Sequence, residues 1–131
     1  MATLRSMTVL DVADVTASVA FYQRLGFASH GIWDGSFAIV QRGQVTLALS
    51  KAAAVVPRNH GWAAYIYVDA LDDLHGEFAT LELPYLSDIE RPDHYGCDDF
   101  TIKDIDGHML AFGQSRNPVP GPGLDEDQGR G

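Results

Sequence analysis

The sequence contains the same pattern of apolar residues twice, with an offset of 56 residues. Each copy is typical of a strand, a tight turn, an amphipathic helix and a return strand. The matching positions are Val12 and Val68, Val15 and Leu71, Tyr22 and Phe78, Leu25 and Leu81, and Phe27 and Leu83. A repeated supersecondary unit constrains the whole architecture, and two copies are too few for a solenoid. The repeat therefore predicts two similar modules related by a pseudo-twofold axis, with a site between them.

Local patterns predict the elements of each copy. Apolar residues at intervals of three or four predict a helix over residues 15–25, capped by Asp14 and ended by Gly26. The same spacing predicts a second helix over residues 71–81. Strand-forming segments lie at residues 7–12, 27–31, 37–40, 45–49, 62–68, 85–89, 100–103 and 109–112. The order predicts an α+β fold of two tandem βαβββ modules, forming curved mixed sheets (cups) with the helices outside.

Length and composition predict a single folded domain. The chain has 131 residues, of which 46% are hydrophobic and 21% charged, values ordinary for a globular protein. We expect one domain over residues 1–116, with module 1 at about 4–52, module 2 at about 62–114 and a linker at 53–61. Residues 117–131 are rich in Pro, Gly and acids, and this composition predicts a disordered tail.

The charge and the cysteine content indicate which binding partners and which cellular compartment we expect. The net charge is −9, and no cluster of Lys and Arg is present, so nucleic acid is not an expected partner. This charge attracts small cationic ligands, although it also serves solubility. The single Cys97 cannot form an intrachain disulfide, which fits a reducing cytosol. Neither a secretory signal nor an apolar run of ~20 residues is present, so we expect a cytoplasmic protein that does not bind membranes.

Three segments together resemble a known family. Residues 10–15 read LxVxDV, residues 21–27 read FYxxLGF, and residues 104–114 read DIDGHMLAFGQ. In combination they resemble the glyoxalase / bleomycin-resistance / dioxygenase family, or vicinal oxygen chelate superfamily, over roughly residues 4–114. The resemblance implies paired βαβββ modules and, usually, a homodimer. Enzymes of the family hold a divalent metal with His or Gln and Glu side chains, whereas its antibiotic-binding members have no metal and sequester a ligand in the groove.

The places that hold metal ligands in the enzymes of this family are occupied by apolar residues here. The resemblance puts them at Met7, Ala48, Ala63 and Ala111. These side chains supply no carboxylate or imidazole, which zinc and hard divalent ions need. The sequence therefore predicts no metal and no cofactor, as in the antibiotic-binding members. None of the five histidines has a metal-binding spacing, and a displaced metal site that uses His94 is the remaining alternative.

The same positions, with nearby aromatic residues, predict a small-molecule site. Met7 and the three alanines would form a roomy apolar floor, and aromatic rings beside a carboxylate would form its rim. The candidate ligand-binding residues are Met7, Trp33, Asp34, Phe37, Ala48, Ala63, Tyr65, Tyr95 and Ala111. Such rings stack on flat molecules and attract cations. The alternative for each aromatic residue is a place in the core or in a dimer interface.

These observations favour one function and leave two alternatives. The favoured hypothesis is a metal-independent, bleomycin-resistance-like homodimer that sequesters an aromatic ligand, which can be cationic, such as an antibiotic. The first alternative is a lyase, isomerase or dioxygenase-like enzyme with a relocated metal or a metal-free acid–base pair. The second is a non-catalytic partner module whose cup is filled by its own side chains. The sequence contains no nucleophile motif or phosphate-binding glycine loop that would favour other chemistry.

Overall fold

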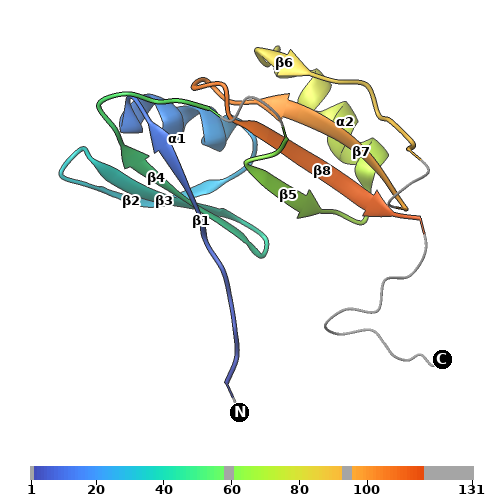
Figure 1. The fold of residues 1–131 in the computed structure, drawn as a ribbon, viewed down its shortest axis with the longest axis horizontal. Coiled ribbons are helices and arrows are strands. Elements are labelled where there is room, and N and C mark those ends of the chain that lie inside the picture. Colours follow the sequence, from blue (N-terminus) through green and yellow to red (C-terminus); the bar gives the residue numbers. More distant parts are fainter. Residues whose placement is uncertain (1, 58–60, 93–95, 117–131) are drawn as a thin grey trace.

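The computed structural model describes residues 2–57, 61–92 and 96–116, which form two βαβββ modules lying side by side (Figure 1). Module 1 consists of β1 (Thr8–Val12), α1 (Val15–Arg24), β2 (Ala28–Trp33), β3 (Phe37–Arg42) and β4 (Val45–Lys51). Module 2 consists of β5 (Ala64–Tyr67), α2 (Leu71–Ala79), β6 (Tyr85–Leu86), β7 (Cys97–Lys103) and β8 (Met109–Ser115). The predicted fold class and the order of its elements are confirmed.

The two sheets have the same topology. Sheet A has the strand order β1-β4-β3-β2, and sheet B has the order β5-β8-β7-β6. In each sheet the first and last strands of the module are parallel neighbours, and the other pairs are antiparallel. Each helix connects its module's first strand, an edge strand, to the opposite edge. The sequence repeat thus corresponds to a repeated mixed sheet.

Each helix packs on one face of its own sheet, and burial on β1 and β3 alternates with a period of two. On β1, Leu10 and Val12 are 3% and 0% exposed, whereas Val9 is 56% exposed. The helix-facing side chains of both modules belong to one hydrophobic cluster that also contains Tyr22 and Phe78. The opposite face of each sheet, called here the open face, has no helix of its own module against it.

The two helices begin differently. At α1, the Asp14 side chain accepts a hydrogen bond from the Ala17 amide at 3.0 Å, and Gly26, with a φ of 90°, follows the last turn. Both features confirm the prediction. At α2, Ala70 has no polar side chain to cap the helix. Gln114 of β8 replaces it, since its Oε1 accepts from the Leu71 amide at 3.1 Å and its Nε2 donates to the Asp69 carbonyl at 3.1 Å.

The turn between β7 and β8 joins the modules. The Tyr22 hydroxyl of α1 donates to Asp104 Oδ2 at 2.8 Å, and the Ala13 amide donates to Asp106 Oδ1 at 3.1 Å. His108 Nε2 lies 2.6 Å from the Asp11 carbonyl oxygen. The DIDGH segment therefore holds module 1 at the start of α1, which gives this hairpin turn a structural role beyond reversing the chain.

The predicted strand over residues 85–89 was too long, because β6 contains only Tyr85 and Leu86. Regular pairing ends at Ser87, whose hydroxyl accepts from the Thr101 amide at 2.9 Å in place of a ladder carbonyl. A single bridge between Glu90 and Asp99 follows. The predicted tail lies outside the described residues. No helix within the described ranges is long and apolar enough to cross a membrane.

Candidate functional site

The open face of sheet A carries the first half of the candidate site. Ala48 at the centre of β4 is aligned with Val9 of β1 and Ile39 of β3, so the three side chains form a row across the sheet. Ala48 is 0% exposed and lies between these two larger side chains. Met7 precedes β1 and is 42% exposed. The floor of this half is therefore apolar, but Ala48 is fully buried and does not open into a cavity.

An aromatic pair forms the edge of the same face. Trp33 and Phe37 are opposite each other on β2 and β3, with ring centroids 6.0 Å apart and planes tilted by 48°. The hairpin between them turns through Asp34 and Gly35, whose φ values of 54° and 65° suit the right-handed twist of the strands. Trp33 is 48% exposed. This pre-positioned pair, in which Trp33 is exposed and Phe37 half-buried, presents ring surface that a flat molecule can stack on.

The open face of sheet B carries the second half, in which Tyr65 is the central residue. Tyr65 is aligned with Ala111 of β8, and its ring crosses Gly113 to donate a hydrogen bond to Asp99 Oδ2 at 3.0 Å. Asp99 is 4% exposed. Burial raises the pKa of the Tyr65 phenol, and hydrogen bonding to Asp99 raises it further. The phenol is therefore neutral across the physiological range and holds the carboxylate in place.

The rings beside Tyr65 extend its surface. Trp62 meets Tyr65 edge to face with centroids 4.6 Å apart, and Tyr67 lies 5.3 Å from Tyr65. Ala63 precedes β5 and shares the face of Tyr65. Both Ala63 and Tyr65 are half-buried, whereas Trp62 and Tyr67 are 37% and 70% exposed. A row of three aromatic rings thus runs along β5, backed by the Tyr65–Asp99 pair.

The donor set does not fit a metal ion at the four family positions. The side chains at Met7, Ala48, Ala63 and Ala111 include no carboxylate or imidazole. Within residues 2–57, 61–92 and 96–116, no three His, Cys, Asp or Glu side chains are grouped so that they could share a metal ion. His94 and Tyr95 lie outside the described residues. The side chains at these four positions therefore give no basis for a metal-assisted step.

In one chain the two halves lie on separate sheets. In the described part of the chain, no hydrogen bond or ring contact joins the Trp33–Phe37 pair to Tyr65. Where the sheets meet, a cavity of about 210 Å³ lies between β1, β4 and β5, and Tyr65 and Tyr67 line it together with Thr8, Gln44 and Thr46. Of the candidate residues within the described ranges, Tyr65 is thus the one that reaches this inter-module cavity.

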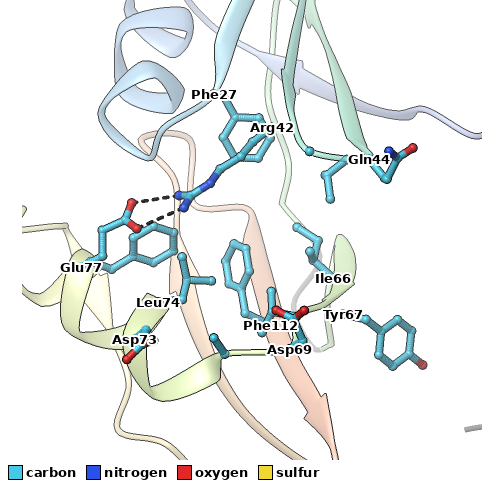
Figure 2. A pocket seen from close by; sticks show the side chains of 15 residues that line it. Phe27, Arg42, Gln44, Ile66, Tyr67, Asp69, Asp73, Leu74, Glu77 and Phe112 are labelled. Carbon is cyan, nitrogen blue, oxygen red and sulfur yellow. Dashed lines mark hydrogen bonds and ion pairs between the residues drawn. The ribbon is translucent and has the colours of Figure 1, made fainter.

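A larger groove, of about 730 Å³, lies between the modules on their helix side (Figure 2). Its walls come from the end of β3 and the β3–β4 loop, from β5 and from α2. None of the candidate ligand-binding residues that the structure describes lines it. The repeat predicted a site between the modules, but the sequence did not identify the residues of this groove, because its walls are brought together only by the packing of one module on the other.

The sequence analysis also missed Asp99 and Gly113. Asp98, the neighbour of Asp99 in the sequence, points to the other face of β7. On that face the Asp98 carboxylate forms ion pairs with Arg91 and Arg116. The pKa of Asp98 is lowered, and the hydrogen bond from Arg116 is the largest cause. The alternation of side chains along β7 indicates in the sequence that Asp99 and Asp98 occupy opposite faces. Nothing in the sequence indicates that the Tyr65 ring crosses Gly113.

The fold and these site positions define a class of protein. The family model described as Glyoxalase/Bleomycin resistance protein/Dioxygenase superfamily matches residues 6–112, and the chain belongs to this superfamily. The resemblance found in the sequence is therefore confirmed. A comparison with curated proteins finds no match.

Solved structures of several family members are similar to this chain. The bleomycin resistance determinant encoded on transposon Tn5 has 21% identity and a TM-score of 0.75, over 88% of this chain and 100% of that one. The bleomycin-binding protein of bleomycin-producing Streptomyces verticillus, solved with copper(II)-bleomycin, has 26% identity and a TM-score of 0.70, over 90% and 99%. Lactoylglutathione lyase from Agrobacterium tumefaciens has 22% identity and a TM-score of 0.67, over 88% and 96%. The same fold therefore occurs in binding proteins and in an enzyme.

Proposed function

We propose that this protein binds a small aromatic molecule, such as an antibiotic, without a metal and protects by sequestering it. The observation that carries the proposal is the composition of the open faces. They present the Trp33–Phe37 pair and the row of rings around Tyr65, while apolar side chains occupy the four metal-ligand positions. Aromatic surface with few fixed polar groups is typical of a small-molecule site. Sequestering a ligand requires affinity for that ligand but no side chain that reacts with it.

We further propose that the functional unit is a homodimer. The open face of sheet A leaves Val9 and Trp33 exposed, and the open face of sheet B leaves Trp62 and Tyr67 exposed. Pairing sheet A of one chain with sheet B of a second chain would cover these side chains. It would also bring Trp33 and Phe37 opposite Tyr65, which gives two equivalent sites per dimer. The cytoplasm is the proposed compartment.

Likeness to known binding proteins supports the ligand class. The Streptomyces verticillus protein and the Tn5 determinant are bleomycin-binding and bleomycin-resistance proteins, and each is similar to this chain over nearly its whole length. Trp33 and Tyr65 provide faces for a planar heteroaromatic ligand, and the net charge of −9 favours a cationic one.

A thermal-shift titration of metal-stripped protein tests the proposal. Bleomycin or another cationic aromatic antibiotic at ~100 Kd should stabilise the fold by about 2.7 kcal/mol, whereas divalent metals alone should not. Trp33→Ala should weaken ligand binding by about tenfold, because one stacked ring contributes about 1 kcal/mol or more. Ile105→Ala is the matched control, since Ile105 is 47% exposed but lies in the β7–β8 turn.

Other outcomes would support the alternatives. Stabilisation by a metal alone would contradict the proposal and favour a lyase or isomerase with a relocated metal, in which His94 is a candidate ligand. The absence of any shift across the panel would favour a non-catalytic partner module. A sedimentation measurement showing a monomer that still binds the antibiotic would exclude the shared site but not the ligand class.

A further inference from the structure

The helix-side groove differs from the open faces in its position and in its chemistry. Its deep wall is apolar and is made by Phe27, Ile66, Phe78 and Phe112, all of which are at most 7% exposed. The half-buried Val45 and Leu74 complete this surface from the two modules. A volume of about 730 Å³ at a junction of modules, apolar in its depth, is the size and form of a small-molecule site.

One end of the groove is closed by an ion pair that is already satisfied. Arg42 of β3 points across to α2, where its NH1 and NH2 lie 2.9 Å and 3.0 Å from the two carboxylate oxygens of Glu77 (Figure 2). Its NH1 also donates to the Leu25 carbonyl at 2.6 Å. Because both charges are engaged with each other, this end of the groove offers little net charge to a ligand.

Two further carboxylates on the rim have no ion-pair partner in the described part of the chain. Asp69 follows β5 and Asp73 lies in the first turn of α2, and both line the groove below Leu74 and Phe112 in Figure 2. Both residues are exposed, and neither carboxylate makes a hydrogen bond or ion pair with any side chain or backbone group in the described ranges. With Arg42 and Glu77 cancelling, the lining has a net charge of about −2, which attracts cations and repels anions.

We propose that this groove is a second ligand site, separate from the open faces, for a small organic cation with an apolar body. The aromatic or aliphatic body would lie against Val45, Leu74 and Phe112, and a protonated amine would lie at the mouth between Asp69 and Asp73. The amine stays near water at this rim, so it does not have to lose its whole hydration shell. This site does not depend on the proposed antibiotic-binding function or on dimer formation.

Three probes that share one body test the charge preference. They are 4-phenylbutylammonium, its neutral analogue 4-phenylbutanol and the anion 4-phenylbutanoate, each titrated into the full chain while amide chemical shifts are recorded. The cation should bind about tenfold more tightly than the anion, with the alcohol between them. The shifts should be centred on Val45, Leu74 and the segment 67–70. Higher ionic strength should reduce the difference between the cation and the anion.

Two neighbouring aspartates provide a matched pair of variants. Asp73→Asn should weaken binding of the ammonium probe by about two- to fivefold and leave the alcohol unchanged. Asp72→Asn removes the same charge from the same turn of α2, but Asp72 does not line the groove, so it should have a smaller effect. Glu77→Gln leaves the Arg42 guanidinium without its partner, and it should raise the affinity for the phenylbutanoate anion.

Several results would overturn this inference. Equal affinity for the cation and the anion would show that the carboxylates do not select the ligand. An equal loss in Asp72→Asn and Asp73→Asn would show only a long-range effect of charge. Shifts centred on Trp33 and Phe37, with none at Val45 or Leu74, would place the amine probe on the open face of sheet A instead.

Discussion

Gly113 lies directly beneath the Tyr65 phenol, where that side chain crosses β8 to reach Asp99. A Cβ atom at residue 113 would lie 2.0 Å from the Tyr65 hydroxyl oxygen and 2.6 Å from Cζ. Real Cβ atoms do not approach other atoms so closely, so any side chain would displace the ring. The glycine is therefore a requirement of the Tyr65–Asp99 hydrogen bond, and not of the backbone conformation of β8.

Replacing this glycine gives a direct test of that arrangement. Gly113→Ala should lower the free energy of unfolding by about 1–3 kcal/mol, because the buried Asp99 carboxylate loses its phenol donor. Chemical denaturation measures this loss. Gly76→Ala is the control: a Cβ there meets nothing within 4 Å, and alanine in the interior of α2 should stabilise by up to about 1 kcal/mol. Equal stability of Gly113→Ala and the parent protein would show that Tyr65 does not need this space.

The two helices illustrate how equivalent elements of a repeat can be completed by different means. Asp14 caps α1 from an adjacent position in the sequence, with its oxygen accepting from the Ala17 amide. Gln114 caps α2 from the end of β8, 43 residues away from Leu71. The second cap therefore forms only after β8 has docked, and it couples the start of α2 to the sheet beneath it.

Because Gln114 of β8 caps α2, replacing this glutamine should lower the stability of the protein. Gln114→Ala should lower the free energy of unfolding by about 1 kcal/mol, as much as the loss of a local N-cap, because the Leu71 amide and the Asp69 carbonyl both lose a partner. Gln23→Ala removes the same chemical group from the exposed face of α1 and should be neutral or slightly stabilising. Urea denaturation of both variants provides the comparison, and equal stabilities would contradict the long-range cap.

The two modules are held together by one shared core and by the hydrogen bonds between the β7–β8 turn and module 1. Tyr22 is 0% exposed and contributes to both, since its ring packs in the core while its hydroxyl donates to Asp104 of the other module. Burial raises the pKa of this phenol well above its ordinary value, and the Asp104 carboxylate raises it further. Ionising Tyr22 would place a second negative charge beside Asp104 at this contact between the modules.

Tyr22→Phe should therefore change both stability and its dependence on pH. At neutral pH the variant should lose about 1–3 kcal/mol, because Asp104 Oδ2 loses its donor. Because the folded pKa of Tyr22 is raised, its contribution is fully present below about pH 10 and is lost as the pH rises toward the folded pKa. The variant should accordingly lose less stability than the parent protein above about pH 10. Denaturant titrations across this range, with Tyr67→Phe as the control for a 70% exposed ring, measure the difference. Parallel pH profiles for Tyr22→Phe and the parent protein would contradict this role.

The candidate site was predictable where strand alternation decides it and unpredictable elsewhere. The shared face of Ala63 and Tyr65 follows from a period of two. The alignment of Ala48 with Val9 and Ile39 does not follow, because it depends on the register of three strands. The roles of Asp99 and of the Arg42–Glu77 pair likewise arise from contacts between segments more than thirty residues apart.

The amino-acid sequence was sufficient for the two modules, the helix start at Asp14, the stop at Gly26 and the superfamily, because these features are encoded in local periodicity and short motifs. The Tyr65–Asp99 pair over Gly113, the Gln114 cap, the joint at Tyr22 and the groove beside α2 were decided only by the tertiary structure. Each depends on the relative placement of elements that are distant in the chain. The periodicity of a segment specifies which face of it is buried, but not which partner that face meets.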